Sequence, residues 1–310
     1  MSLRVACIGT GTVGSAFAVV FARAGHDVAL FDAAPGAVET FALKRIRATL
    51  DLLETEGALA EPVEAIMSRI RPAASLADAV KGADYVQESV AEEVAVKRAV
   101  FAALGEAAPA GAILASSTSA LAGSRFLDAA ARPERCLVAH PVNPPSLIPL
   151  VEICPAPFTA AETVERARTL LAAAGMSPVT LAREIDGFIL NRLQYTLVAE
   201  ALHLVGEGYC TAADIDRVVT EGLAPRWASI GPFEVAHLNA VDGFQGFVAR
   251  LGGMMRAMGQ GARTDYDWSA DLVAAIHAEL EQHVPVAEIP ARQAWRDRRI
   301  LATRRLQKGD

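Results

Sequence analysis

The stretch Gly9-Thr10-Gly11-Thr12-Val13-Gly14 decides the fold. It follows the apolar run Arg4–Ile8 and opens a helix-favouring segment, Ser15–Gly25. Gly9 permits a tight turn, Gly11 lets a pyrophosphate approach the backbone, and Gly14 lets the helix pack closely on the strand. The diphosphate of a dinucleotide would then lie against free N–H groups at the helix N-terminus. The stretch therefore predicts the first unit of a dinucleotide-binding domain.

An acidic residue supports this prediction and selects the cofactor. Asp32 ends the next β-branched run, 18 residues after Gly14. A carboxylate there accepts hydrogen bonds from the adenosine ribose hydroxyls and repels a 2′-phosphate, so we expect NAD rather than NADP. The alternative is a structural turn followed by a surface aspartate, which the strand–loop–helix context disfavours.

The first half of the chain alternates short β-branched runs with longer Ala-rich helical stretches, which is typical of a parallel sheet built from βαβ units. The long charged segment Pro35–Arg71 is expected to form a helical excursion rather than a simple crossover. The expected strands are Arg4–Ile8, Asp27–Phe31, Tyr85–Gln87, Ala112–Ala115, Cys136–Ala139, Leu150–Ile153 and Pro178–Leu181.

After Asp186-Gly187 the pattern becomes helical throughout. Apolar residues mark one face of a long helix ending at Gly206 and Gly208: Ile189, Leu193, Leu197, Ala201, Leu204 and Val205. Further helical segments are Ala212–Glu221, Pro232–Leu251, Ser269–Glu281 and Pro290–Leu306. The sequence therefore predicts an α/β protein. An N-terminal Rossmann-type doubly wound sheet (residues 1–185), which binds NAD, is followed by an all-helical C-terminal domain (residues 186–310).

Composition excludes several classes of protein. The chain is 52% hydrophobic and has a net charge of -7, from 29 Lys and Arg against 36 Asp and Glu. An acidic chain has no broad attraction to phosphate backbones or anionic lipids, so neither nucleic acid nor a membrane is expected as a partner. No apolar stretch approaches a membrane span, and the N-terminus is too short and glycine-broken for a signal peptide. The four cysteines are scattered without a C-x-x-C pair, so we expect no metal site, no disulfide framework and a cytoplasmic location.

Polar residues at the expected strand ends form a candidate catalytic group. His140 ends one apolar run, and Glu152 lies in the next, after a Pro-rich loop. A histidine at the carboxyl edge of such a sheet could accept a hydroxyl proton, and a neighbouring carboxylate could fix its tautomer. Ser116–Ser119 follow another strand on the same edge, and Asn191-Arg192 begins the long helix. Taken alone, each has a structural alternative: a buried histidine, a paired carboxylate, a helix cap or an inter-domain hydrogen bond. The sequence has no G-x-S-x-G elbow, so a serine hydrolase is not expected.

Together these motifs resemble the 3-hydroxyacyl-CoA dehydrogenase family over essentially the whole chain. Within it, His140-Pro141-Val142-Asn143-Pro144 is similar to the branch containing L-gulonate 3-dehydrogenase, also known as lambda-crystallin, whereas acyl-CoA enzymes typically carry Phe-Phe-Asn-Pro after the histidine. Ser117 stands where acyl-CoA enzymes commonly have Asn.

The resemblance implies a role for each matching residue. His140 would be the general base, Glu152 its orienting partner, and Ser119 and Asn191 hydrogen-bonding groups for the reacting oxygen or the histidine. Arg226 would clamp a sugar-acid carboxylate, the alternative being a surface arginine. A homodimer built through the helical domain, which would also bind substrate, is typical of the family. The positions that match NAD contacts are Thr12, Val13, Asp32, Glu92 and Lys97.

Three functional hypotheses remain open at this point. The first is NAD-dependent oxidation of the 3-hydroxyl of a small hydroxy acid, with L-gulonate to 3-dehydro-L-gulonate as the favoured reaction. The second is an L-3-hydroxyacyl-CoA (3-hydroxybutyryl-CoA) dehydrogenase, in which Lys44, Arg45 and Arg47 would meet the CoA phosphates. The third is a non-catalytic, crystallin-like NAD-binding protein.

Overall fold

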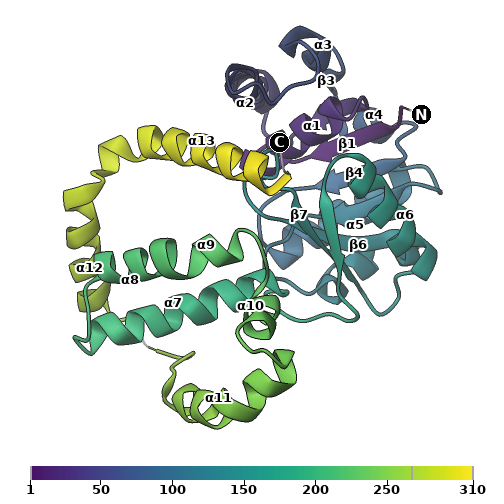
Figure 1. Cartoon of the computed structure of the whole chain (residues 1–310). Helices are drawn as coiled ribbons and strands as arrows, with labels where there is room; N and C mark the ends of the chain where they lie inside the picture. The colour runs from purple at the N-terminus through teal and green to yellow at the C-terminus, as the bar shows by residue number, and fades with distance from the viewer. Residues whose placement is uncertain (1, 267, 309–310) are drawn as a thin grey trace. The chain divides into compact units, whose positions relative to one another are not determined.

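The computed structural model describes residues 2–266 and 268–308 (Figure 1). The chain divides into two compact units, Met1–Asn191 and Arg192–Asp310. Each unit is described by itself below.

Unit 1 is built on one eight-stranded sheet with the strand order β3-β2-β1-β4-β5-β6-β7-β8. Every run that the sequence predicted to be a strand is one, with its ends shifted by at most two residues. The strands are β1 (Arg4–Ile8), β2 (Asp27–Phe31), β3 (Ile70–Pro72), β4 (Tyr85–Glu88), β5 (Ile113–Ser116), β6 (Cys136–Pro141), β7 (Leu150–Pro155) and β8 (Ser177–Thr180).

Two features of the sheet correct the sequence prediction. The expected helical excursion Pro35–Arg71 ends in an edge strand, β3, of which only Ile70 is buried, so its apolar pattern is too short to detect. Strand β7 pairs antiparallel with β6, although a parallel sheet was expected. The loop between them is short, and only antiparallel neighbours can be joined without a long crossover.

Helices flank the sheet of unit 1 (Figure 1). The excursion is helical up to β3, and its α2 buries Ile46, Leu50 and Leu53 at helical spacing, whereas Phe41 is 63% exposed. The helices are α1 (Thr12–Arg23), α2 (Leu43–Thr55), α3 (Val63–Met67), α4 (Leu76–Val80), α5 (Val94–Ala107) and α6 (Ala161–Ala173), with a π-helix η1 (Val38–Ala42) and the 3-10 turns η2 (Gly123–Arg125), η3 (Leu127–Ala129) and η4 (Pro133–Arg135).

The core of unit 1 lies on both faces of β1 and β4. Phe21 of α1 packs against Tyr85, with ring centroids 5.5 Å apart. On the other face, Phe101 of α5 packs against Phe126 beside Val86. Because successive side chains of a strand point to opposite faces, neighbouring residues of β4 enter different layers. This alternation places the polar groups described below.

The described cysteines are free. Burial raises the pKa of the Cys7 thiol to about 12, so it behaves as an apolar core residue. No group of three His, Cys, Asp or Glu side chains within residues 2–266 and 268–308 could hold a metal ion. The cytoplasmic location expected from the cysteine pattern stays a prediction.

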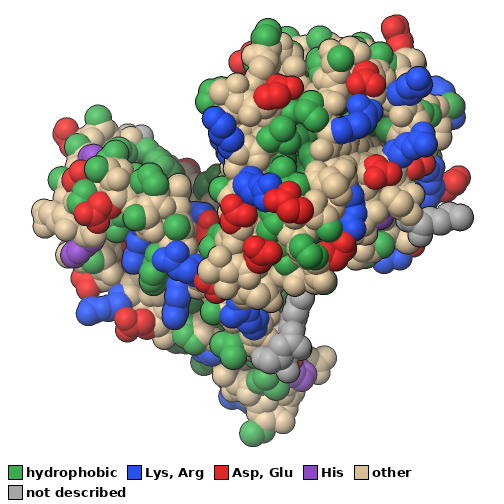
Figure 2. Space-filling model, turned by 90° about the horizontal axis from the view of Figure 1, so that it is seen from above, with side chains coloured by type: hydrophobic (Ala, Val, Ile, Leu, Met, Phe, Trp, Pro, Cys, Tyr) green, Lys and Arg blue, Asp and Glu red, His purple; other side chains and the backbone are tan. Residues whose placement is uncertain are grey.

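Unit 2 is helical wherever it is described, and α7 begins just before the division between the units. Figure 2 shows one face of the whole chain, on which basic and acidic side chains are interspersed with apolar ones. No described helix is long and apolar enough to cross a bilayer. The helices are α7 (Leu190–Gly206), α8 (Ala212–Arg217), η5 (Val218–Leu223, a π-helix), α9 (Ala224–Trp227), α10 (Pro232–Leu238), α11 (Gly243–Gly261), α12 (Ala270–His283), η6 (Val286–Glu288) and α13 (Ile289–Lys308).

Two predictions for the helical half were wrong. The segment Pro232–Leu251 is two helices: α10 ends at Leu238, and α11 begins at Gly243, whose φ of +72° does not fit a continuous helix. The apolar face expected on α7 is not the buried one: Leu193 is 66% exposed, while Ala199 and Leu202 are buried. Periodicity identifies an apolar face but not the neighbour that covers it.

Candidate active site

The glycine loop has the shape that a dinucleotide needs. Gly9 has φ +84°, and a Cβ on it would lie 2.6 Å from the Ser89 carbonyl oxygen. A Cβ on Gly14 would lie 1.9 Å from the Gly9 carbonyl oxygen, so only glycine lets α1 pack here. A Cβ on Gly11 would meet no atom within 4 Å, and Gly11, the N-cap residue of α1, has no side chain to cover the first N–H groups of the helix. The backbone at the helix N-terminus is therefore open to a pyrophosphate, with Thr12 exposed and Val13 half-buried beside it.

Asp32 follows β2 and is anchored by the backbone around it. Its Oδ2 accepts hydrogen bonds from the Thr10 N–H (2.7 Å) and the Thr10 hydroxyl (3.0 Å), and its Oδ1 accepts one from Ala34 N–H (3.0 Å). Burial acts to raise the pKa of this carboxyl, but these hydrogen bonds outweigh it and lower the pKa below its usual value. Asp32 is therefore an ionised, fixed acceptor, which fits the ribose hydroxyls of NAD.

Glu92 and Lys97 lie together around a buried glutamate that sequence reasoning missed. The Lys97 ammonium, with a side chain only 1% exposed, is 2.9 Å from Glu88 Oε1 and 3.3 Å from Glu92 Oε2. Glu88 also accepts hydrogen bonds from the Ser116 hydroxyl (2.6 Å) and from Val90 N–H (2.7 Å). Lys97 is thus neutralised within unit 1, and it fixes the loop after β4.

The same cluster reaches Ser119. Glu92 Oε1 accepts hydrogen bonds from the N–H groups of Ser119 (2.8 Å) and Ala120 (3.1 Å) and from the Thr118 hydroxyl. Burial acts to raise the pKa of Glu92, but the Thr118 hydroxyl, the Lys97 charge and the two amides together lower it. An ionised Glu92 therefore holds the loop that carries Ser119 at the carboxyl end of β5.

His140 and Glu152 face each other across the β6–β7 pair, where they are register partners. His140 Nδ1 lies 2.9 Å from Glu152 Oε2, and the two side chains are 5% and 2% exposed. Glu152 Oε1 accepts hydrogen bonds from Ile189 N–H (2.9 Å) and Leu190 N–H (3.1 Å), at the start of α7. Burial acts to raise the pKa of Glu152, but the bond with His140 and the two amides lower it.

This geometry determines which ring nitrogen of His140 carries the hydrogen. An ionised Glu152 only accepts hydrogen bonds, so Nδ1 carries the hydrogen and Nε2 is the basic nitrogen. No described residue hydrogen-bonds Nε2. The Phe188 ring packs on the imidazole with centroids 5.0 Å apart, and Phe188 itself is held at φ +52°. Sequence reasoning gave Phe188 no role, although it directly follows Gly187, where the pattern becomes helical.

Asn191 and Ser119 are brought together through the backbone. The Asn191 side-chain amide donates to the Ser119 carbonyl oxygen (2.7 Å), and the Ser119 side chain is exposed. Neither side chain hydrogen-bonds His140 here, so their contact with a reacting oxygen stays a prediction.

Arg226 lies in unit 2, on α9, directly after the π-helix η5. It is exposed and its guanidinium donates to the Gly222 carbonyl oxygen (3.4 Å). Within residues 2–266 and 268–308 it forms no salt bridge with a carboxylate.

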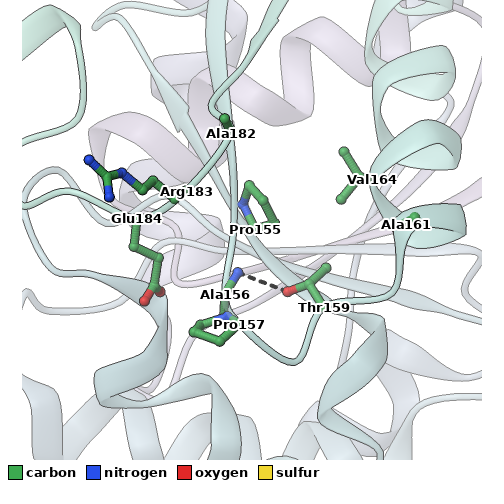
Figure 3. A pocket seen from close by; sticks show the side chains of 9 residues that line it. All are labelled: Pro155, Ala156, Pro157, Thr159, Ala161, Val164, Ala182, Arg183 and Glu184. Carbon is green, nitrogen blue, oxygen red and sulfur yellow. Dashed lines mark hydrogen bonds between the residues drawn. The ribbon is translucent and has the colours of Figure 1, made fainter.

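A pocket of about 650 Å³ in unit 1 is not part of this arrangement (Figure 3). It is lined by Pro155 at the end of β7, by Ala156, Pro157 and Thr159 after it, by Ala161 and Val164 of α6, and by Ala182–Glu184. Pro155 pairs with Leu137, at the opposite end of β6 from His140. None of the predicted site residues lines it.

Comparison with known proteins identifies the family of this chain. Residues 4–185 match the model of the 3-hydroxyacyl-CoA dehydrogenase NAD binding domain, and residues 187–286 match that of the family's C-terminal domain. A lambda-crystallin homolog of Bos taurus is 42% identical over 297 residues, which cover 94% of this chain and 92% of that protein. An L-carnitine dehydrogenase of Streptomyces griseus is 45% identical over 230 residues, which cover 74% of this chain and 67% of that protein.

A solved structure shares the fold over the full length. It is the 5-formyl-3-hydroxy-2-methylpyridine 4-carboxylic acid 5-dehydrogenase, described as an NAD+ dependent dismutase, with a TM-score of 0.77 and 28% identity. The match covers 100% of this chain and 99% of that one. The glycine loop, the anchored Asp32 and these matches agree on NAD as the cofactor. This chain therefore belongs to the 3-hydroxyacyl-CoA dehydrogenase family, as an NAD-dependent oxidoreductase that acts on a CH–OH group of a small-molecule substrate.

Proposed function

We propose that this enzyme oxidises the 3-hydroxyl of a small free hydroxy acid, with L-gulonate as the first candidate. The observation that carries the proposal is the buried His140–Glu152 pair, which leaves one basic ring nitrogen without a protein partner. NAD, held by the glycine loop and Asp32, would supply the hydride acceptor. The catalytic roles below are inferred from this pair and from the family resemblance.

The proton moves through the histidine. His140 Nε2 accepts the proton of the substrate hydroxyl while the C3–H bond breaks, and the ring becomes an imidazolium. Glu152, 2.9 Å from Nδ1, stabilises that charge and keeps the ring in the required tautomer. The amides of Ile189 and Leu190 hold Glu152 in turn, so its orientation does not depend on solvent. The exposed Ser119 hydroxyl and the Asn191 amide are the nearby groups that we assign to the reacting oxygen.

Two observations support this substrate class. One relative is an L-carnitine dehydrogenase, and carnitine, like gulonate, is a free carboxylic acid with a hydroxyl at C3. In addition, α2 is poorly suited to CoA phosphates. Arg47 is engaged with Glu64 (2.6 Å), the second half of the helix carries Asp51 and Glu54, and Glu56 follows directly after it. A free acid needs no such phosphate site. The 3-hydroxyacyl-CoA alternative, for which Lys44 and Arg45 stay exposed on α2, is the second candidate to test.

A free acid does need a cation for its carboxylate. Arg226 is exposed, carries no carboxylate partner among the described residues, and lies on a helix preceded by a π-helix. π-Helices are rare and frequent at functional sites. We assign the carboxylate to Arg226, the NAD-binding domain to residues 1–185 and the substrate and dimerisation domain to residues 186–310.

We further propose a homodimer formed through the helical domain. Many large apolar side chains of unit 2 are strongly exposed, among them Leu193 at 66%, Phe233 at 77% and Met258 at 60%. Exposed apolar surface of this extent marks interaction sites. Sedimentation velocity across a range of protein concentrations tests the dimer, and a monomer at micromolar concentration would contradict it.

The decisive experiment follows NADH absorbance with purified protein. L-gulonate and L-carnitine are offered with NAD, and acetoacetyl-CoA is offered with NADH. Turnover of a free hydroxy acid, lost in His140→Asn by about 10²–10⁴-fold without loss of NADH binding, supports the proposal. Turnover of acetoacetyl-CoA alone would replace it with the CoA thioester function.

A further inference from the structure

Strand β4 carries a second buried series of hydrogen-bonded polar side chains, on the face opposite Glu88. Tyr85 and Gln87 both point toward α1 and are fully buried. The Tyr85 hydroxyl donates to Gln87 Oε1 (2.7 Å), and Gln87 Nε2 donates to the Ser117 hydroxyl (2.7 Å). Leaving either the oxygen or the NH₂ group of a buried amide unpaired costs free energy, so both hydrogen bonds of Gln87 hold its side chain in place.

The direction of the Gln87 amide is fixed by its surroundings. Its Nε2 also lies 3.5 Å from the Ala139 carbonyl oxygen, and the reversed amide would place two acceptors together there. Burial raises the pKa of Tyr85 well above its usual value, so the Tyr85 hydroxyl keeps its proton and donates. The Gln87 N–H group therefore points at Ser117, whose oxygen accepts it.

The Ser117–Ser89 pair has one more hydroxyl proton than its internal hydrogen bonds use. The Ser117 and Ser89 hydroxyl oxygens lie 2.9 Å apart, so one of their two protons is used between them. Ser117 already accepts the Gln87 N–H, and the second serine proton has no acceptor among the residues that the structure describes. One hydroxyl is therefore left to donate outward. Ser89 is only half-buried, so this end of the hydrogen-bonded series is open to a ligand.

The pair lies on the path of the dinucleotide. A Cβ on Gly14 would come within 3.4 Å of Ser89 Cβ, so Ser89 lies directly against the glycine loop. Ser89 and Ser117 follow β4 and β5, between the loop after β1 and His140 on β6, whereas Asp32 follows β2 on the other side. A dinucleotide with its adenosine ribose on Asp32 and its pyrophosphate on the loop would extend its nicotinamide half toward this pair.

We propose that Gln87 is a positioning residue for NAD. It orients the Ser117–Ser89 pair so that one hydroxyl donates a hydrogen bond to the nicotinamide half of the cofactor. Gln87 acts only through the serines. The proposal depends on NAD binding alone and not on the identity of the substrate.

Isothermal titration calorimetry with NADH and with ADP tests it on the apoprotein. ADP ends before the nicotinamide ribose and serves as a probe of the adenosine side. In Ser89→Ala, in Ser117→Ala and in Gln87→Leu, the Kd for NADH should rise about 2- to 12-fold, as expected for one lost hydrogen bond, while the Kd for ADP stays unchanged. Ser68→Ala, an exposed serine at the opposite edge of the sheet, should change neither Kd.

A double-mutant cycle separates positioning from packing. Adding Gln87→Leu to Ser89→Ala/Ser117→Ala should weaken NADH binding no further, because Gln87 has no other route to the cofactor. An unchanged NADH Kd in both serine variants would overturn the proposal, and so would an equal rise of the Kd values for NADH and ADP. The serine variants remove little buried volume, since Ser89 is half-buried. If Gln87→Leu does not fold, Gln87→Met takes its place, because it keeps the length of the side chain and removes both hydrogen-bonding groups. An unchanged NADH Kd in Gln87→Met would also overturn the proposal.

Discussion

Glu152→Gln probes the active site more sharply than removal of the histidine. Glu152 receives three N–H donors, His140 Nδ1, Ile189 N and Leu190 N, and offers only oxygens. Glutamine has nearly the same shape but one oxygen and one NH₂ group. Because two amides point at the Oε1 position, the glutamine oxygen must take that place, and the NH₂ group then faces His140 Nδ1.

The consequence is a change of tautomer. A donor opposite Nδ1 forces that nitrogen to accept, so the ring proton moves to Nε2 and the basic nitrogen is lost. The comparable change in a serine protease, where the aspartate beside the histidine becomes asparagine, lowers kcat by about 10⁴. We expect kcat to fall about 10²–10⁴-fold, the NADH Kd to stay unchanged, and the free energy of unfolding to fall by about 1–3 kcal/mol.

Two measurements together decide the matter. Steady-state kinetics on the substrate found above gives kcat, and ¹⁵N NMR of the histidine ring reports the tautomer of His140 without any substrate. Glu165→Gln, an exposed carboxylate on α6, is the matched control and should alter neither. If Glu152→Gln kept both full kcat and a proton on Nδ1, the assignment of His140 as a base oriented by Glu152 would be refuted.

Three further predictions test the groups around the cofactor. Gly14→Ala should destabilise the protein by about 1–3 kcal/mol or more, since its Cβ would lie 1.9 Å from a backbone oxygen, whereas Gly11→Ala should unfold like the wild type in urea but bind NADH more weakly. Lys97→Met should cost about 3–5 kcal/mol in urea unfolding, because it leaves the fully buried Glu88 without its cation. Burial lowers the pKa of His26, so the folded state takes up a proton less readily than the unfolded state. Stability should therefore fall as pH drops below about 6.5, by at most about 1.4 kcal/mol per pH unit, and His26→Gln should flatten that slope.

Each of these has a contrary outcome. Equal stability of Gly14→Ala and wild type would mean that α1 does not pack as described. A Lys97→Met protein as stable as wild type would show that Glu88 is not held as an ion by Lys97. A slope that survives in His26→Gln would assign the acid sensitivity to another group.

The sequence predicted most of the sheet because β-branched runs bounded by turn residues carry a local signal. It missed β3, where one buried residue is too little to form a pattern, and the direction of β7, which depends on its connection. It predicted the wrong buried face of α7, since the apolar stripe through Leu193 is not the one that the helices of unit 2 cover.

For the site, motifs at strand ends identified His140 and Glu152, whose pairing follows from the register of β6 and β7. Glu88 and Gln87 were missed because their partners, Lys97 and Ser117, are distant in sequence. A signal was present: both are polar residues at the end of an otherwise apolar run. Such residues survive inside a sheet only when a neighbour satisfies them.

The two polar residues of β4 explain why this short strand matters for a cofactor at the point where the strand order reverses. Glu88 faces α5 and, through Lys97 and Glu92, fixes the backbone that carries Ser119. Gln87 faces α1 and fixes the hydroxyls of Ser117 and Ser89 beside the glycine loop. Since adjacent residues of a strand point to opposite faces, the two networks share no side chain. Perturbing one network should leave the other in place. The Lys97→Met/Ser89→Ala double variant should therefore show the stability loss of Lys97→Met and the NADH affinity loss of Ser89→Ala, each of the same size as in the single variant.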